Sequence, residues 1–222
     1  MNAFTMGVVT SICATVICTM LARFGPRRVR TLLFGILSTL LGCNICHIYE
    51  NEGEAAEDIL REAADSTSVR VLSIRGMRLT SEDRPLSKLI RPGFCKGTVE
   101  VMLADRDSVA LEARAAGFAL DTCTYSTNDR YKQDVIRSLN VLHEVSKKNP
   151  NLSVRTHHEP QSFRIIFTDE HAFLSFFPKG RSGSTSRVHK IPRKTDLYHA
   201  LEEHYCSVRQ NRSKQYNGEY VV

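Results

Sequence analysis

The sequence predicts an α/β protein in which a two-helix transmembrane hairpin precedes an α/β sandwich with a mixed sheet. Two apolar runs, residues 3–21 and 31–49, predict the hairpin. Neither contains Asp, Glu, Lys or Arg, and each approaches the roughly 20 residues that a spanning helix needs. Strand-like and helix-like segments alternate after residue 66, which predicts the sandwich. We therefore divide the chain into a transmembrane hairpin (1–49), an acidic helical connector (50–66) and an α/β domain (67–222).

Both apolar runs carry small residues at spacings of four, three and four, which place them on one face of each helix. Small residues let helices approach closely in lipid, where the hydrophobic effect does not drive helices together. The pattern predicts packing within the hairpin or a homo-oligomer. The residues are Gly7, Ser11, Ala14 and Cys18 in the first run, and Gly35, Ser38, Gly42 and Cys46 in the second.

The charges that flank the hairpin conflict with the cysteine content. Four arginines and no acid lie in the loop over residues 22–30, and acidic residues follow the second run, so the positive-inside rule places the loop in the cytoplasm and both termini outside. Seven cysteines are an odd number, and the three in the domain, Cys95, Cys123 and Cys206, show no disulfide or metal-ligand spacing. Unpaired thiols fit a reducing compartment instead, which places the domain in the cytoplasm. A hairpin that is held in a cytosolic complex at rest, and enters the membrane when released, would reconcile the two observations.

The connector and the first elements of the domain follow from periodicity and from helix-ending residues. Residues 50–66 are acidic, rich in alanine and amphipathic, which predicts a helix. Alternating side chains over Ser68–Ile74 predict a strand. A short helix is predicted from Thr80 or Ser81 to Ile90, before the Pro-Gly pair that follows.

Two further helices and a strand occupy the middle of the domain. Residues 97–104 alternate valine and leucine with polar residues, which predicts a strand. An aspartate-rich segment then introduces a helix over Ser108–Phe118. Residues 127–148 carry apolar side chains at steps of three and four, and Pro150 follows them, so we predict a long helix that ends there.

The last third of the chain predicts three strands and one helix. Leu152–Arg155 is a short strand, and Ser162–Phe167 and Ala172–Phe177 form a hairpin. Residues 178–186, with their glycines and serines, predict a flexible loop. Apolar side chains recur on one side of Thr195–Arg209, which predicts the final helix.

This order of elements, with the motif Ser162-x-Arg164-x4-Asp169, resembles one phospholipase D-like domain. That superfamily carries His-x-Lys-x4-Asp, in which the histidine attacks phosphorus and the lysine binds phosphate. The resemblance implies that Ser162, Arg164 and Asp169 line a phosphate or nucleic-acid site. Lys179 and Arg181, in the predicted loop, would close over the anion.

The serine in place of the histidine removes the nucleophile of that family. A serine hydroxyl needs an adjacent base, and His157, His158 and His171 are the histidines near it in the sequence. We therefore expect a degenerate domain that is not an enzyme, with no catalytic residue, metal or cofactor.

The charge distribution is compatible with an anionic partner. The formal net charge is +6, and nine Lys or Arg residues against four acids lie from Lys179 onward. Such a surface suits nucleic acid, anionic lipid or an acidic protein without distinguishing among them.

A two-helix hairpin joined to a degraded phosphodiesterase-like module resembles the two-transmembrane effectors of bacterial anti-phage systems of the retron type. The resemblance implies a multi-pass toxin of the bacterial inner membrane. A reverse transcriptase and its RNA–DNA hybrid would hold it inactive through the C-terminal domain until phage infection releases it to cause abortive infection. Two alternatives stay open: a membrane-tethered phosphodiesterase or nuclease, and a nucleotide-gated membrane effector.

Overall fold

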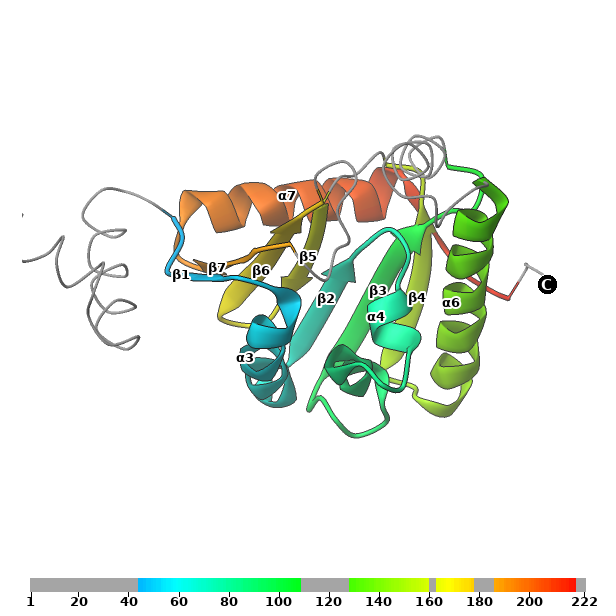
Figure 1. Ribbon diagram of the computed structural model, residues 1–222, viewed down its shortest axis with the longest axis horizontal. Coiled ribbons are helices and arrows are strands. Elements are labelled where there is room, and N and C mark those ends of the chain that lie inside the picture. The colour runs from blue at the N-terminus through cyan, green and yellow to red at the C-terminus, as the bar shows by residue number, and fades with distance from the viewer. Residues whose placement is uncertain (1–43, 109–127, 160–162, 178–185, 219–222) are drawn as a thin grey trace, which may run out of the picture. The chain divides into compact units, whose positions relative to one another are not determined.

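An eight-stranded mixed sheet in the order β1-β7-β6-β5-β2-β3-β4-β8 is the centre of the fold (Figure 1). The computed structural model describes residues 44–108, 128–159, 163–177 and 186–218. The strands are β1 (His47–Tyr49), β2 (Ser68–Leu72), β3 (Thr98–Ala104), β4 (Leu152–His157), β5 (Phe163–Phe167), β6 (His171–Phe176), β7 (Val188–Pro192) and β8 (Ser213–Gln215). The helices are α3 (Glu52–Asp65), α4 (Met77–Thr80), the 3-10 helix η1 (Pro85–Ile90), α6 (Asn128–Lys148) and α7 (Asp196–Asn211).

Strands β2, β3 and β4 are parallel, and β5 runs antiparallel beside β2. The register pairs Leu72 with Met102 on one side and with Ile165 on the other. The carboxyl ends of β2, β3 and β4 and the amino end of β5 therefore lie at one edge of the sheet. We call this the carboxyl edge, and it is where ligands bind in many open α/β sheets.

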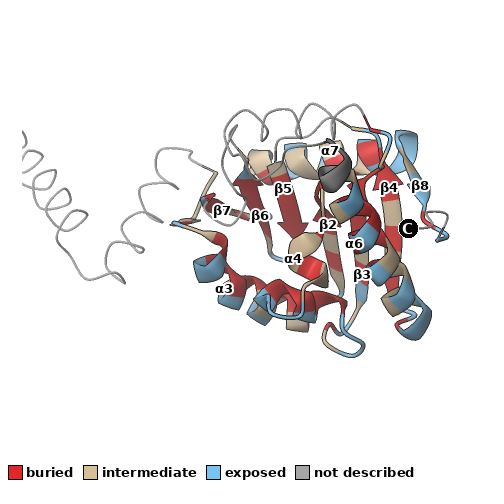
Figure 2. Cartoon of the chain, turned by 45° about the vertical axis from the view of Figure 1, so that its right-hand side comes forward, coloured by how far each residue is buried: buried red, intermediate tan, exposed pale blue. Residues whose placement is uncertain are grey.

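Helices cover both faces of the sheet, so the domain has three layers (Figure 1). On one face, α3, η1 and α6 bury apolar side chains against Val71, Val101 and Val154. On the other face, the Tyr205 ring of α7 packs edge-on against the ring of Phe167. Figure 2 shows that burial is concentrated on the strands and on the sides of the helices that face them.

Helix α3 is positioned by its cap and by an apolar stripe. The side chain of Asn51 accepts a hydrogen bond from the amide of Glu54 at 3.1 Å, which satisfies one of the free amides of the first turn. Ala55, Ile59 and Ala63 recur at steps of four and are fully buried in the core. The predicted helix over residues 50–66 is confirmed within two residues at its start and one at its end.

Gly97 is a position where no side chain fits. A Cβ there would lie 1.8 Å from the carbonyl oxygen of Thr67, which belongs to the rigid entrance of β2. We expect Gly97→Ala to lower the free energy of unfolding by about 1–3 kcal/mol, since the backbone has to move to relieve the clash. Urea unfolding measures the loss. Thr98→Ala, at the exposed next residue, is the control and should stay within about 0.5 kcal/mol of the parent.

The predicted transmembrane hairpin is wrong where the structure describes it. Residue 49 was expected to end a spanning helix, but His47–Tyr49 forms strand β1, and the Tyr49 hydroxyl donates to the Asp58 carboxylate. Tyr49 is thus part of the sheet domain rather than of an apolar helix. Among the described residues no helix has the length and apolarity that crossing a membrane requires.

The predicted fold class and the predicted multi-pass location in the inner membrane are corrected accordingly: the structure supports a mixed eight-stranded α/β fold. Cys46, assigned to the second small-residue face, is half-buried and directly precedes β1. The other seven residues of the two faces lie outside the described residues: Gly7, Ser11, Ala14, Cys18, Gly35, Ser38 and Gly42.

Most predicted elements of the domain are confirmed, with differences at turns and edges. The helix predicted from Thr80 or Ser81 to Ile90 is only partly confirmed: the structure has the 3-10 helix η1 from Pro85 onward, and the short helix α4 ends where the predicted helix was to begin. Strands β1, β7 and β8 were not predicted. The predicted helix over 108–118 and the predicted loop over 178–186 fall almost wholly outside the described residues.

Candidate functional site

Buried polar side chains gather at the carboxyl edge of the sheet. Ser73 follows β2, Asp105 follows β3, and His157 ends β4; all three are buried. Arg164 near the start of β5 and Ser175 near the end of β6 are buried opposite each other. Burying a polar group without a partner is unfavourable, so this concentration marks the edge as the candidate site.

Arg164 lies beneath the surface in an ion pair with Glu52, the first residue of α3. Its Nη1 is 2.6 Å from Oε2 of Glu52, and its Nη2 donates to the Ser175 hydroxyl at 3.3 Å. Arg164 is 4% exposed and Glu52 is 5% exposed. The Nε atom of Arg164 has no hydrogen-bond partner among the described residues. The predicted phosphate-binding arginine therefore already holds a counterion.

Two further arginines follow the end of β2. Arg75 places Nη1 3.4 Å from Oδ2 of Asp134, and Arg78 places Nε 3.7 Å from Oε1 of Glu52. Their side chains are 21% and 25% exposed, so they are more accessible than Arg164. We call Arg75, Arg78 and Arg164 the arginine cluster.

Gly76 makes the turn that brings Arg75 and Arg78 to this edge. Its φ of 71° is in the left-handed region, which glycine adopts without strain. A Cβ at this position would also lie 2.5 Å from Cδ1 of the buried Leu103. The chain therefore leaves β2 sharply and starts α4 immediately, with one arginine on each side of the glycine.

Among the described residues, two carboxylates, Glu52 and Asp134, form ion pairs with the three arginines of the cluster. Burial lowers the pKa of Arg78, Glu52 raises it, and Arg84, Arg164 and Arg75 lower it again, so that it lies below its ordinary value. Within the cluster, one carboxylate, Glu52, is shared by Arg78 and Arg164. An added anion would relieve the repulsion among the guanidinium groups. Guanidinium groups offer a planar fork of donors that matches the oxygens of phosphate or carboxylate.

The histidines near this edge differ in their burial and in their contacts. His157 is fully buried, and its Nε2 lies 3.2 Å from the carbonyl oxygen of Ser73, so Nε2 carries the proton and donates. Burial lowers its pKa to about 4. His158 is mostly exposed, with Nε2 3.8 Å from Oδ2 of Asp105. His171 belongs to a different place in the fold.

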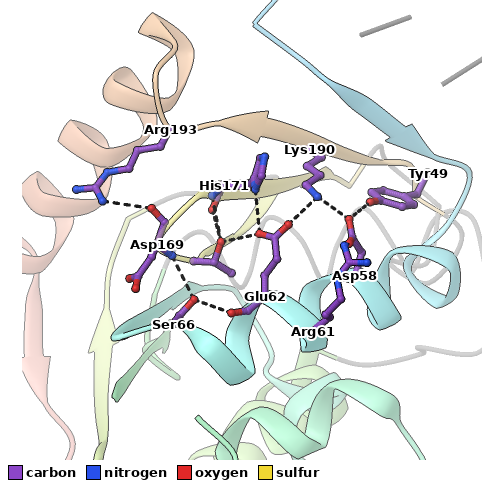
Figure 3. A network of polar contacts seen from close by, with 10 residues as sticks. Tyr49, Asp58, Arg61, Glu62, Ser66, Asp169, His171, Lys190 and Arg193 are labelled. Carbon is purple, nitrogen blue, oxygen red and sulfur yellow. Dashed lines mark hydrogen bonds and ion pairs between the residues drawn. The ribbon is translucent and has the colours of Figure 1, made fainter. Parts of the chain in front are cut away.

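That place is a polar network where α3 meets β6 and β7 (Figure 3). Lys190 of β7 lies 2.7 Å from Oδ2 of Asp58 and 2.6 Å from Oε1 of Glu62. Glu62 also accepts from Nδ1 of His171 at 3.0 Å and from the Thr168 hydroxyl at 2.9 Å. We call Asp58, Glu62, Thr168, His171 and Lys190 the anchor network.

The anchor network connects α3 to the sheet. All of its members except Asp58 line a cavity of about 430 Å³ together with Ser66 and Asp169, among other residues. Burial favours the neutral form of Glu62, but His171 and Lys190 outweigh it, so the pKa of Glu62 lies below its ordinary value. An ionised carboxylate that accepts from three donors is suited to holding elements together.

Asp169 has a local structural role. Its carboxylate accepts from the amide and hydroxyl of Thr67 at 2.7 and 2.9 Å, and from the amide of Ser68 at 3.3 Å. These bonds fix the entrance of β2. Asp169 follows the end of β5, whereas Arg164 is near its start, so the structure does not bring the two residues into one site.

The other three predicted site residues, Ser162, Lys179 and Arg181, lie outside the described residues.

Sequence reasoning missed Arg78 and Glu52 and treated Arg75 only as the residue after a strand. A usable signal was present. Arg75-Gly76 directly follows a buried strand whose neighbour along the chain is another strand, and a parallel pair would put that exit at a ligand-binding edge.

Comparisons with known proteins do not support the predicted family. No protein-family model matches the chain, and no curated protein matches it. One solved structure that the chain resembles is TrmBL2, an archaeal chromatin protein described with a novel mode of DNA binding. The identity is 9%, the match covers 94% of this chain and 68% of that one, and the TM-score is 0.43. A likeness of that extent carries no inference about this protein. The predicted resemblance to a retron-type two-transmembrane effector with a phospholipase D-like domain is therefore wrong.

Proposed function

We propose that this protein binds a phosphate-bearing ligand, such as a nucleotide, at the arginine cluster. The observation that carries the proposal is the position of Arg78. It is partly buried beside two other arginines and lies 3.7 Å from the one carboxylate that it shares with Arg164. A phosphate bound to Arg78 would place negative charge beside guanidinium groups that repel one another.

The position in the fold and the chemistry of the side chains support a phosphate over an uncharged ligand. The cluster lies at the carboxyl ends of parallel strands, where open α/β sheets commonly bind nucleotides. Arg75 and Arg78 flank a glycine turn, so two guanidinium groups approach the edge from one short segment. Hydrogen bonds between arginine and phosphate are charge-assisted and are about twice as strong as neutral ones.

The test is a calorimetric titration of the purified chain with AMP, with inorganic phosphate and with a short single-stranded oligonucleotide. For the probe that binds most tightly, we expect Arg78→Gln to weaken binding at least tenfold, because a charged hydrogen bond contributes about 1.5–3 kcal/mol. Arg91→Gln, at an exposed arginine after η1, is the control and should change the affinity less than twofold. Failure of all three probes to bind, or equal binding by Arg78→Gln, would contradict the proposal.

The activities predicted from the sequence, a toxin under the control of a partner and a membrane-tethered phosphodiesterase, stay predictions. The reverse transcriptase and RNA–DNA partners also stay predictions. The arginine cluster supports the nucleotide-binding part of the remaining alternative, the nucleotide-gated effector, since its guanidinium groups can bind phosphate without a nucleophile.

A further inference from the structure

We infer that Glu52 opposes ligand binding at the arginine cluster, so that a bound phosphate loosens the first turn of α3. This inference rests on the proposed function and adds a regulatory consequence to it. Glu52 would act as an internal anion with which the ligand competes, and its position in the chain would transmit the result to the start of α3.

The contacts of Glu52 make it a direct competitor. Its Oε2 is 2.6 Å from Nη1 of Arg164, and its Oε1 is 3.7 Å from Nε of Arg78. A phosphate that binds Arg78 therefore comes to lie beside a carboxylate that is 5% exposed. Water screens two like charges poorly at such a buried position, so the phosphate and Glu52 repel each other.

The chain connectivity determines what this repulsion moves. Glu52 is the first residue of α3 and follows the capping residue Asn51. About two and three turns further along, Asp58 and Glu62 tie the same helix to Lys190. The anchor network thus holds the later turns of α3. The first turn is held by the Asn51 cap, by the Glu54 carboxylate, which accepts from the amide of Glu50 at 3.1 Å, and by Glu52. A displaced Glu52 consequently loosens the start of the helix and the Glu50–Asn51 link to β1.

The first experiment compares AMP binding by the intact chain and by Glu52→Gln, a variant that keeps the shape and removes the charge. We expect Glu52→Gln to bind AMP at least tenfold more tightly, because a like charge within a few ångströms of the phosphate is removed. Glu57→Gln is the matched control. Glu57 is an exposed acid of the same helix, and its replacement should change the affinity less than twofold.

The second experiment needs no variant and is decisive if Glu52→Gln does not fold. Hydrogen exchange of the unaltered chain is measured with and without saturating AMP. We expect faster exchange at the amides of Glu54 and Ala55, which bond to Asn51, and no acceleration in the later turns of α3. Slower or unchanged exchange at those two amides would overturn the inference.

The outcomes separate the inference from the proposed function. Binding of AMP that depends on Arg78 but is unchanged or weaker in Glu52→Gln defeats the role of Glu52 and leaves the phosphate site standing. Absence of binding in both the unaltered chain and Glu52→Gln defeats the site itself. Binding of AMP by both proteins, at least tenfold tighter in Glu52→Gln, supports both.

Discussion

Replacing Lys190 with methionine is expected to lower the free energy of unfolding by about 3 kcal/mol, the low end for removing one partner from a buried ion pair, because Lys190 and its two carboxylates are partly buried. The Lys190 side chain is 12% exposed and lies between Asp58 and Glu62, at 2.7 and 2.6 Å. Burial alone would lower its pKa, but the two carboxylates outweigh burial and hold the pKa above its ordinary value. Methionine fills a similar volume and leaves both carboxylates without their common cation.

Urea unfolding of the two proteins measures this loss. Lys194→Met, at an exposed lysine just after β7, is the control and should stay within about 0.5 kcal/mol of the parent. Adding Glu62→Gln to the Lys190 variant should recover part of the loss, because it removes one of the two carboxylate charges that no longer have Lys190 as a partner. A loss below about 1 kcal/mol for Lys190→Met would show that the anchor network does not hold α3 on the sheet.

Lys190 also explains why part of the sheet could not be predicted. The segment Val188–Pro192 has two apolar residues separated by histidine and lysine, so it lacks the alternation of a half-buried strand. Lys190 points inward because Asp58, 132 residues away in the sequence, meets it there. By contrast, β2 and β3 were predictable from the local sequence, since their buried side chains are apolar.

The membrane prediction failed for a related reason. An apolar run of helical length is typical of a spanning segment. The same run can instead end in a β-strand when another strand pairs with it. Here Tyr49 is the last residue of β1 in the eight-stranded sheet, and Asp58 accepts from its hydroxyl. The pairing of β1 with β7 cannot be predicted from the apolar run alone, because β7 lies far away in the sequence.

The candidate site was only partly accessible from sequence. Arg164 was predicted as a phosphate-binding residue, but the carboxylate that it contacts comes from α3, 112 residues earlier. Arg75 and Arg78 become neighbours of Arg164 because β2 pairs with β5 in antiparallel register. Long-range pairing of this kind creates a charge cluster that no short motif displays.

The stability of the protein should fall as the pH is lowered from about 6.5 to about 4, and His157 should cause much of the loss. Burial lowers the pKa of His157 from its ordinary 6.5 to about 4. In that window the unfolded chain binds a proton at this histidine and the folded chain does not, so the unfolded state gains stability as the pH falls. A difference of this size corresponds to about 3 kcal/mol at the acid end of the window.

Denaturant unfolding at intervals from pH 7 to pH 4.5 measures the effect. His157→Gln, whose amide can still donate to the carbonyl of Ser73, should flatten the curve, and His158→Gln should leave it as in the parent because His158 is largely exposed. His189, whose pKa burial and Arg187 also lower, accounts for a smaller slope that remains in His157→Gln. The pKa values of Asp58 and Glu62 are lowered, so protonation of these two carboxylates destabilises the fold only at a pH below the measured range. An equally steep curve for His157→Gln would mean that the buried imidazole accepts a proton without unfolding, and that the carboxyl edge admits water at β4.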